Sequence, residues 1–179
     1  HLPLICIIQI EVKVIHKSAV CVPIFFIDNE PYLILIRRSR KLRRHPGQIS
    51  FPGGFIEKGE SALQAAVREM QEEIGVKDNC FVVLGKLSCT VTVTSSVEIT
   101  PFLVVINCGE FHLNKDEVEE IYFVSLELFK NTKCVKIVMP NGNVTCRYSL
   151  RELVVWGATA RIINESLSQI EQMLKEVKR

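Results

Sequence analysis

The sequence predicts an α/β or α+β sandwich built on a mixed β-sheet. Three observations lead to this fold class: short runs rich in β-branched or aromatic residues, two stretches with helical periodicity, and the mixing of both along the chain. The 179 residues are 47% hydrophobic and 23% charged, which is typical of a globular protein. Because no repeat, linker or low-complexity stretch divides the chain, we expect one domain over residues 1–179.

The N-terminal part contains three candidate strands. The apolar run at residues 2–10 is too short to span a bilayer and lacks the basic flank of a signal peptide, so we expect a strand and no membrane span. Residues 20–27 and 32–36 are β-branched or aromatic and flank Asp28-Asn29-Glu30-Pro31, a sequence typical of a turn. These two runs are therefore predicted to form a β-hairpin.

The clearest helix is predicted at residues 61–74, where apolar residues recur on one helix face and Gly75 follows as a stop. Asn141-Gly142 joins two later apolar runs and is typical of a tight β-hairpin. A final helix is predicted over much of residues 151–175, with a weak point at Gly157. Further strands are expected at residues 81–87, 99–106 and 118–124, the last followed by a short turn or helix through Phe129.

Charge and cysteine usage narrow the functional classes. The formal net charge of +2 gives no argument for nucleic acid or an anionic membrane as a partner. The seven cysteines form no C-x-x-C pair, and most lie among apolar or β-branched neighbours. That pattern is typical of reduced thiols in an intracellular protein. A zinc site is not expected, because neither Cys nor His occurs at ligand spacing.

The stretch at residues 54–76 carries the chemistry. Glu69, Glu72 and Glu73 stand at i, i+3 and i+4, so they share one helix face. Like-charged pairs on an exposed helix repel by roughly 0.2–0.5 kcal/mol each, and Arg68 can offset part of this through Glu72 at i+4. A hard divalent cation such as Mg²⁺ or Mn²⁺ can offset the rest. Three glutamates alone would more simply form a solvated acidic face.

The whole stretch matches G-x5-E-x7-R-E-U-x-E-E-x-G-U, where U is an apolar residue. We call this pattern the box. Its seven fixed identities coincide by chance on the order of once in 10⁸ starting positions. On these residues the sequence resembles the Nudix hydrolases, which cleave diphosphate bonds in nucleotide-containing substrates. The resemblance implies an α/β/α sandwich with a mixed central sheet.

The resemblance also implies roles. Glu69 and Glu73 are expected to be the main ligands of Mg²⁺ or Mn²⁺, with Glu72 sharing a further ion and a carbonyl of Gly53 or Gly54 completing the site. Arg68 is expected to orient these catalytic carboxylates. The structural residues of the motif are expected to be Glu60 and Gly75. The general base stays open between Glu69 and four glutamates that would more simply be solvated surface residues: Glu98, Glu117, Glu119 and Glu120.

A second motif precedes the first. Residues 34–54 resemble L-L-T-x-R-S-x3-R-x3-G-x3-F-P-G-G of the coenzyme A diphosphatase branch, with Ile36 in place of Thr and without the extra box residues that this branch often carries. The resemblance implies cleavage of coenzyme A or its derivatives to 3′,5′-ADP and 4′-phosphopantetheine products. Six of the eight residues at 37–44 are basic, which suits a substrate with three phosphates. Substrate contacts are expected from Arg38, Ser39, Arg43, His45, Gly47 and Gly53.

Two alternatives stay open. The same chemistry could act on ADP-ribose, a dinucleotide, an oxidised nucleoside triphosphate or capped RNA. A Nudix fold could also bind a nucleotide or RNA without cleaving it, but such a protein would be expected to lose box glutamates, and all are present. We therefore expect a small nucleotide substrate rather than nucleic acid.

The sequence also gives expectations for the C-terminal part and for the location of the protein. Residues 117–121 and 156–161 also resemble the coenzyme A branch, and residues 130–179 are expected to shape the cleft or a homodimer contact. The protein is expected to be intracellular, in the cytoplasm, mitochondrion or peroxisome. The chain ends Lys-Val-Lys-Arg rather than Ser-Lys-Leu, so the simplest peroxisomal signal is not expected.

Overall fold

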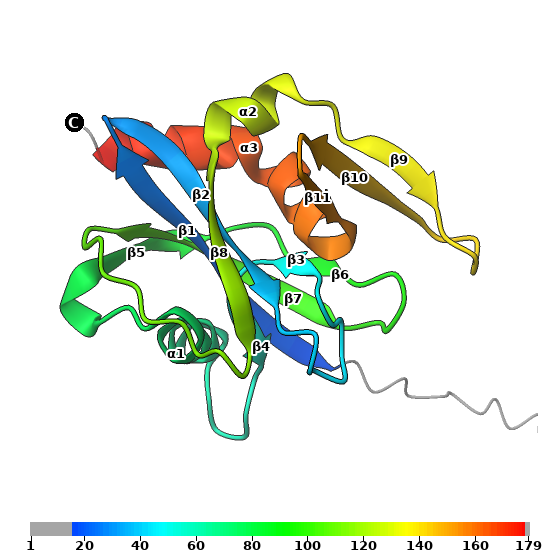
Figure 1. The fold of residues 1–179 in the computed structure, drawn as a ribbon, viewed down its shortest axis with the longest axis horizontal. Helices are drawn as coiled ribbons and strands as arrows, with labels where there is room; N and C mark the ends of the chain where they lie inside the picture. Colours follow the sequence, from blue (N-terminus) through cyan, green and yellow to red (C-terminus); the bar gives the residue numbers. More distant parts are fainter. Residues whose placement is uncertain (1–15, 178–179) are drawn as a thin grey trace, which may run out of the picture.

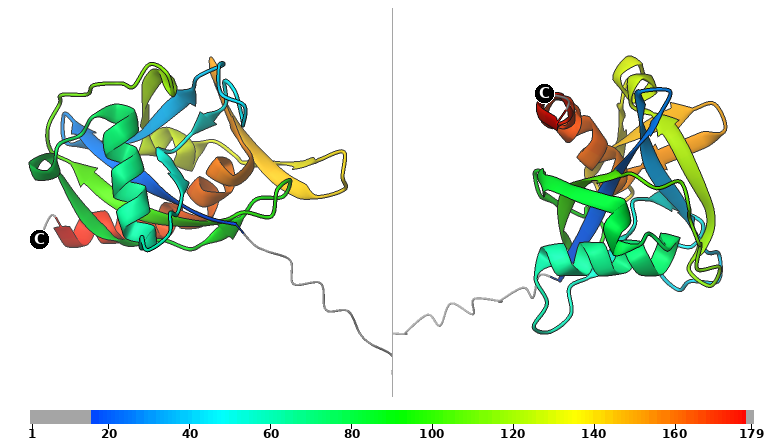
Figure 2. Two further views of the ribbon diagram at one scale, coloured as in Figure 1. Left: turned by 90° about the horizontal axis from the view of Figure 1, so that it is seen from below. Right: turned by 90° about the vertical axis from the view of Figure 1, so that its left-hand side faces the viewer.

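The computed structural model describes residues 16–177, and a mixed sheet forms its centre (Figure 1). Helix α1 (Ala62–Ile74) covers one face of this sheet, while α3 (Gly157–Val177) and a smaller second sheet lie on the other (Figure 2). The mixed α+β fold class is therefore confirmed. The strand predicted at residues 2–10 lies outside the described residues.

The central sheet combines one parallel pairing with antiparallel ones. Strand β1 pairs in parallel with β7, and the remaining pairings described in this sheet are antiparallel. Its strands are β1 (Lys17–Ile27), β2 (Glu30–Arg38), β3 (Ile49–Ser50), β4 (Gly53–Phe55), β5 (Phe81–Lys86), β6 (Thr90–Val91), β7 (Glu98–Ile106) and β8 (Val118–Ser125). The second sheet contains β9 (Val135–Val138), β10 (Val144–Leu150) and β11 (Leu153–Trp156), and the remaining helices are η1 (Asp78–Cys80) and α2 (Leu126–Asn131).

Both faces of the central sheet are buried, which explains why its strands are apolar without strict alternation. Cys21 of β1 faces the core cluster under α1, whereas Val22 and Ile24 face the cluster shared with α3 and the second sheet. The sheet is thus the middle layer of a sandwich, as the resemblance implied.

Both predicted hairpins are confirmed. Strands β1 and β2 are antiparallel, and Asp28 and Asn29 join them with φ values of 51° and 65°. Two-residue hairpin turns of this kind require the left-handed region, which Asn and Asp tolerate better than most residues. Strands β9 and β10 are antiparallel around Asn141 and Gly142.

The final helix, predicted over much of residues 151–175, is confirmed, but it does not include residues 151–156. Residues 153–156 form strand β11, which pairs with β10, and the helix begins at Gly157 with φ 72°. A four-residue apolar run next to a helical pattern has no periodicity of its own, so the sequence does not separate it from the helix.

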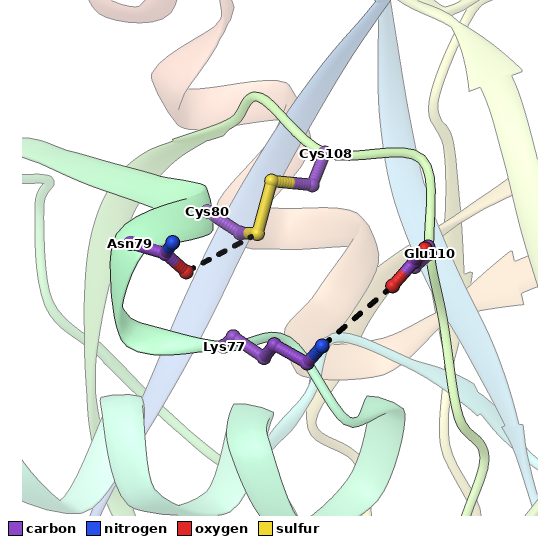
Figure 3. Close-up of a disulfide and its surroundings, with 5 residues drawn as sticks. All are labelled: Lys77, Asn79, Cys80, Cys108 and Glu110. Atoms are coloured by element: carbon purple, nitrogen blue, oxygen red, sulfur yellow. Dashed lines mark hydrogen bonds and ion pairs between the residues drawn. A yellow bond between two sulfur atoms is a disulfide. The ribbon is translucent and has the colours of Figure 1, made fainter.

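The expectation of reduced thiols was wrong for four cysteines. Disulfides join Cys80 to Cys108 (Figure 3) and Cys134 to Cys146, whereas Cys21 and Cys89 are free. The partners stand 28 and 12 residues apart, and the fold brings their Cα atoms to 5.1 and 5.6 Å. Since disulfides persist mainly in oxidising compartments, the cysteines no longer support the intracellular location, which stays a prediction.

Within residues 16–177, no helix is both long and apolar enough to span a bilayer.

Candidate functional site

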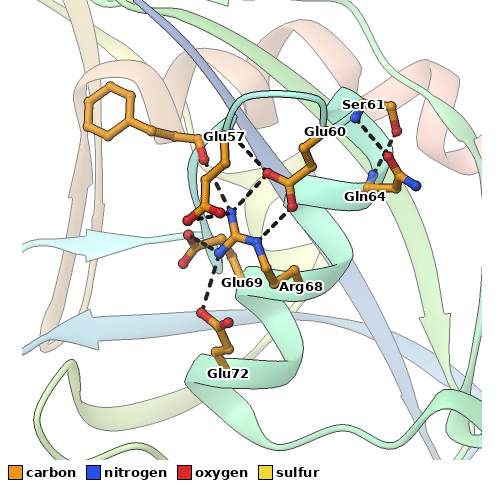
Figure 4. Close-up of polar contacts among 8 residues, drawn as sticks. Glu57, Glu60, Ser61, Gln64, Arg68, Glu69 and Glu72 are labelled. Atoms are coloured by element: carbon orange, nitrogen blue, oxygen red, sulfur yellow. Dashed lines mark hydrogen bonds and ion pairs between the residues drawn. The ribbon is translucent and has the colours of Figure 1, made fainter.

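Local sequence fixes both ends of α1, which carries the box glutamates. The Ser61 hydroxyl accepts a hydrogen bond from the Gln64 N–H, and the Gln64 side chain accepts one from the Ser61 N–H (Figure 4). This capping box satisfies two N–H groups that the helix start would otherwise leave without partners. At the other end, Gly75 adopts φ 72° and its N–H donates to the Gln71 carbonyl, the left-handed cap that favours glycine.

Two adjacent glycines bring β4 against the helix and against β1. The Gly53 N–H donates to Glu73 Oε2 at 3.0 Å. A Cβ atom on Gly54 would stand 2.4 Å from Glu69 Oε1, and one on Gly53 would stand 2.4 Å from the Ala19 carbonyl oxygen. Only glycine permits this approach, so the β4 backbone lies directly beside the two carboxylates.

The structure groups three carboxylates, and one of them is not in the box. Oxygens of Glu69, Glu73 and Glu117 all lie within 4.8 Å of one another. Ligand oxygens around a single Mg²⁺ stand up to about 4.2 Å apart, so small side-chain movements would let this set hold one ion. The donor chemistry also fits, because three hard carboxylate oxygens converge.

Glu72 lies apart from this group. Its carboxylate is 53% exposed and contacts Arg68 Nη1 at 3.4 Å. Its predicted part in binding a further ion stays a prediction, as does that of the Gly54 carbonyl. From the sequence, Glu117 was one of four downstream candidates for the general base. Only the fold distinguishes it from the other three, because it lies beside Glu69 and Glu73.

Burial controls the electrostatics of the group. Glu73 is almost fully buried, and this burial raises its pKa to about 8, although the Gly53 N–H bond opposes the shift. Burial also raises the pKa of Glu69, while Arg68 opposes that shift. Cys21 lies near Glu73, and burial raises the pKa of its thiol to about 12, so it stays protonated and is a poor nucleophile.

The raised pKa of Glu73 predicts that the metal-free protein loses stability as the pH rises. The folded state keeps a proton on Glu73 between the ordinary pKa of 4.5 and about 8, whereas the unfolded state releases it. Stability must therefore fall across that window. In EDTA, we expect the Tm of the wild type to drop by a few degrees between about pH 5.5 and about pH 8.5, relative to the Glu73→Gln variant.

Differential scanning calorimetry would measure this dependence. Added Mg²⁺ should raise the Tm more at about pH 8.5 than at about pH 5.5, because a metal ion binds the ionised carboxylates. Parallel pH profiles for the wild type and the variant would contradict the assignment.

Arg68 connects the loop after β4 to the helix (Figure 4). Its Nε and Nη2 donate to the two carboxylate oxygens of Glu60 at 2.7 and 3.1 Å, and Nη2 also donates to the Phe55 carbonyl at 3.3 Å. Its Nη1 contacts Glu69 at 2.8 Å and Glu72 at 3.4 Å, so the i, i+4 ion pair predicted from the sequence is confirmed. A guanidinium fork suits this geometry better than an ammonium group would.

The loop that carries Glu117 is tied to the region around the C-terminal end of α1. The Asn114 N–H donates to the Glu73 carbonyl at 3.0 Å, and Asn114 also accepts from the Glu117 N–H at 3.0 Å through its own carbonyl. The Cys80–Cys108 disulfide anchors the start of the same loop (Figure 3). A hydrogen bond from the His112 N–H to the Ile74 carbonyl at 2.9 Å completes the attachment.

The basic segment at residues 37–44 divides into two sets. Arg38 and Arg44 line the same cleft as the three carboxylates, and the Arg44 guanidinium lies over the Phe55 ring at 5.2 Å. Arg37 instead donates to the Tyr122 hydroxyl at 2.7 and 2.9 Å, and Arg40 pairs with Glu119 at 3.6 Å. Only part of the basic cluster therefore faces the carboxylates.

The predicted substrate contacts divide in the same way. Arg38, His45 and Gly53 line the cleft, whereas Ser39, Arg43 and Gly47 are not among its lining residues. Ser39 is 2% exposed, and its hydroxyl accepts from the Lys41 N–H. Burial, followed by Arg38 and Arg44, lowers the pKa of His45, so a neutral imidazole faces the cleft near pH 7.

The cleft has a volume of about 870 Å³. The three carboxylates lie along it, together with the segment that contains Arg38, Arg44 and His45. Residues from the β6–β7 connection and from the start of α3 also line it, as does Trp156 at the end of β11. The sequence had singled out Trp156 only as part of a resemblance, without a role.

Several known proteins are similar to this chain in sequence. A model of the NUDIX domain matches residues 15–142. The protein named "Uncharacterized Nudix hydrolase NudL" from Pectobacterium atrosepticum is 37% identical over 160 residues, which cover 86% of this chain and 82% of that protein. The protein of the same name from Yersinia enterocolitica is 33% identical over 161 residues, covering 87% and 82%.

Solved structures show the same fold at low identity. A MutT/nudix family protein from Enterococcus faecalis superposes with a TM-score of 0.60 at 16% identity, covering 97% of this chain and 70% of that one. A MutT protein from Methanosarcina mazei gives a TM-score of 0.55 at 18% identity, covering 94% and 99%.

Proposed function

Because the chain belongs to the Nudix hydrolase family and is a diphosphatase of that family, we propose that its substrate is coenzyme A or one of its derivatives. The products are 3′,5′-ADP and a 4′-phosphopantetheine compound. One observation carries the proposal: the cleft places Arg38, Arg44 and His45 along the same cavity as Glu69, Glu73 and Glu117. A diphosphate with a separate phosphate on its ribose needs both kinds of group.

Nudix hydrolases generally use divalent metal ions such as Mg²⁺ or Mn²⁺, and the donor set of this cleft suits them. Glu69, Glu73 and Glu117 would hold the ion, with Glu72 and the Gly54 carbonyl as the further ligands that the motif implies. When bound, the ion orients the diphosphate, lowers the pKa of a water molecule and stabilises charge on the departing phosphate.

The protein itself contributes positioning and charge. Arg68 fixes Glu69 through an ion pair of 2.8 Å, and the Gly53 N–H fixes Glu73. Arg44 offers a planar guanidinium group that can form paired hydrogen bonds to phosphate. Arg38 already donates from Nε and Nη2 to the Arg44 carbonyl, at 3.4 and 3.3 Å, and adds a positive charge to the cleft. Glu117 stands where its carboxylate either ligates the ion or accepts a proton from the attacking water.

A substrate panel tests the proposal. Purified protein with Mg²⁺ or Mn²⁺ is given coenzyme A, ADP-ribose, NADH, a diadenosine polyphosphate and 8-oxo-dGTP, and the products are identified by mass spectrometry. We expect release of 3′,5′-ADP from coenzyme A with a kcat/KM roughly tenfold or more above the others. Faster cleavage of another compound would reject coenzyme A and leave the diphosphatase chemistry unchanged.

Dephospho-coenzyme A, which lacks the 3′-phosphate, sharpens the panel. Arg44→Gln should lower kcat/KM for coenzyme A roughly tenfold more than for the dephospho compound, because one charged hydrogen-bonding partner is lost. Arg40→Gln is the matched control, since Arg40 pairs with Glu119 and does not line the cleft.

A further inference from the structure

The cleft contains a wall without charge. Residues that line the cleft from positions 92–99 and 156–162 include Thr94, Val97, Ile99, Trp156, Thr159 and Ile162, and none of the lining residues from these positions is charged. The charged residues that line the cleft all come from the segments at 38–73 and from Glu117. We call the first set the uncharged wall.

Neighbouring polar groups hold the uncharged wall in place. Arg161, in the first turns of α3, donates to the Val91 carbonyl and is not among the residues that line the cleft. The amides of Asn141 and Asn143, in the β9–β10 turn, both donate to the Val93 carbonyl, at 3.2 and 2.6 Å. The carbonyls of Val91 and Val93 thus bind groups outside the cleft.

Strand β11 and α3 bring Trp156 to this wall. Trp156 pairs with Arg147 at the end of β11, and Gly157, with φ 72°, turns the chain directly into α3. Trp156 and Ile162 therefore line the cleft from two sides of one tight turn. Trp156 keeps part of its surface exposed, whereas Ile162 is almost fully buried.

We propose that the uncharged wall is the subsite for the uncharged arm of the substrate, with Trp156 as its specificity-determining residue. This inference rests on the proposed function, because it concerns the pantetheine arm and any acyl chain attached to it. A divalent ion held by the carboxylates would bind the diphosphate, and Arg38 and Arg44, which line the same cleft, would attract the phosphorylated ribose. A phosphate placed on the uncharged wall would lose hydration without gaining a counter-charge.

The pantetheine arm of coenzyme A suits the uncharged wall. Pantetheine carries amides and methylene groups but no charge, and an attached acyl chain is entirely apolar. Binding of such a chain to an indole ring and aliphatic side chains is favourable, because apolar surface is removed from water. The enzyme should therefore favour medium-chain acyl-coenzyme A over free coenzyme A.

Kinetics with two substrates test the subsite. Trp156→Ala should lower kcat/KM for octanoyl-coenzyme A roughly tenfold more than for free coenzyme A, mainly through KM. Trp156→Phe should restore most of the difference, since it returns an apolar ring. Val154→Ala is the matched control, because Val154 lies two residues earlier in β11, is 47% exposed and does not line the cleft. An unchanged substrate ratio in Trp156→Ala would overturn the proposal.

Fluorescence gives a second readout that does not need turnover. Trp156 is the single tryptophan of the chain, so its emission reports on this wall alone. In EDTA, octanoyl-pantetheine should shift the emission to the blue in a saturable way, and 3′,5′-ADP should not. A shift with 3′,5′-ADP alone would place the nucleotide on this wall and overturn the proposal.

The two readouts separate the two proposals. A protein that cleaves coenzyme A but shows an unchanged ratio in Trp156→Ala rejects the subsite alone. One that cleaves no coenzyme A derivative, yet responds to octanoyl-pantetheine, rejects the proposed function and keeps an apolar subsite.

Discussion

Glu73→Gln is expected to lower kcat by roughly 10³-fold or more while leaving the fold intact. Glu73 is the most buried of the three grouped carboxylates, and an amide cannot supply the negative charge that a divalent ion requires. The fold should tolerate the change, because the amide oxygen of glutamine can still accept the hydrogen bond from Gly53 N–H. Steady-state kinetics and circular dichroism would measure the two effects.

The control for this variant is Glu110→Gln. It makes the same change of charge at an exposed position, where Glu110 pairs only loosely with Lys77 at 3.7 Å, and its kcat should stay within about twofold of the wild type. Isothermal titration with Mn²⁺ should show weaker binding for Glu73→Gln only. Full activity in Glu73→Gln would mean that the metal ions bind away from this group.

Glu117→Gln is expected to lower kcat by roughly 10²-fold or more, with a smaller change in KM. The loss follows whether Glu117 ligates the ion or takes the proton from water, because both need an ionised carboxylate. The pH dependence of kcat separates these functions. Loss of the acid limb would identify Glu117 as the base, and an unchanged profile with weaker metal binding would identify it as a ligand.

Glu120→Gln is the matched control for Glu117→Gln. Glu120 stands three residues further along the chain, is 60% exposed and contacts Arg37 and Tyr122 rather than the other carboxylates. Its replacement should leave kcat within about twofold. Equal losses in both variants would show that the loop, and not the carboxylate of Glu117, limits the reaction.

The part of the site that the sequence predicts is the part encoded locally. Glu69 and Glu73 share a helix face because helical geometry requires it, and the Ser61 and Gly75 caps follow from residues within one turn of each helix end. Glu117 stands 44 residues beyond Glu73. Its position depends on the pairing of β8 with β2 and on the attachment of the preceding loop to α1, which no local pattern contains.

The same limit explains the other differences. The sequence of β11 has the pattern of the start of the following helix. It forms a strand because it pairs with β10. The cysteine pairs depend on the register of β9 with β10 and on where the loop after β7 passes η1. Arg37 and Arg40 belong to the same basic run as Arg38, and only the fold shows that their guanidinium groups contact Tyr122 and Glu119.

The two glycines of β4 have separate evolutionary consequences. A side chain at Gly53 would collide with the backbone of Ala19 and Val20, whereas the three atoms nearest to a Cβ at Gly54 all belong to the carboxylate of Glu69. A lineage that lost Glu69 could therefore accept a new residue at the second glycine and keep the same sheet. A new residue at the first glycine would require β1 and β4 to separate, whatever the lineage retains of its chemistry. Among diverging descendants, a substitution at Gly54 would thus indicate a change in the catalytic carboxylates. A substitution at Gly53 would indicate a change in the packing of β4 against β1.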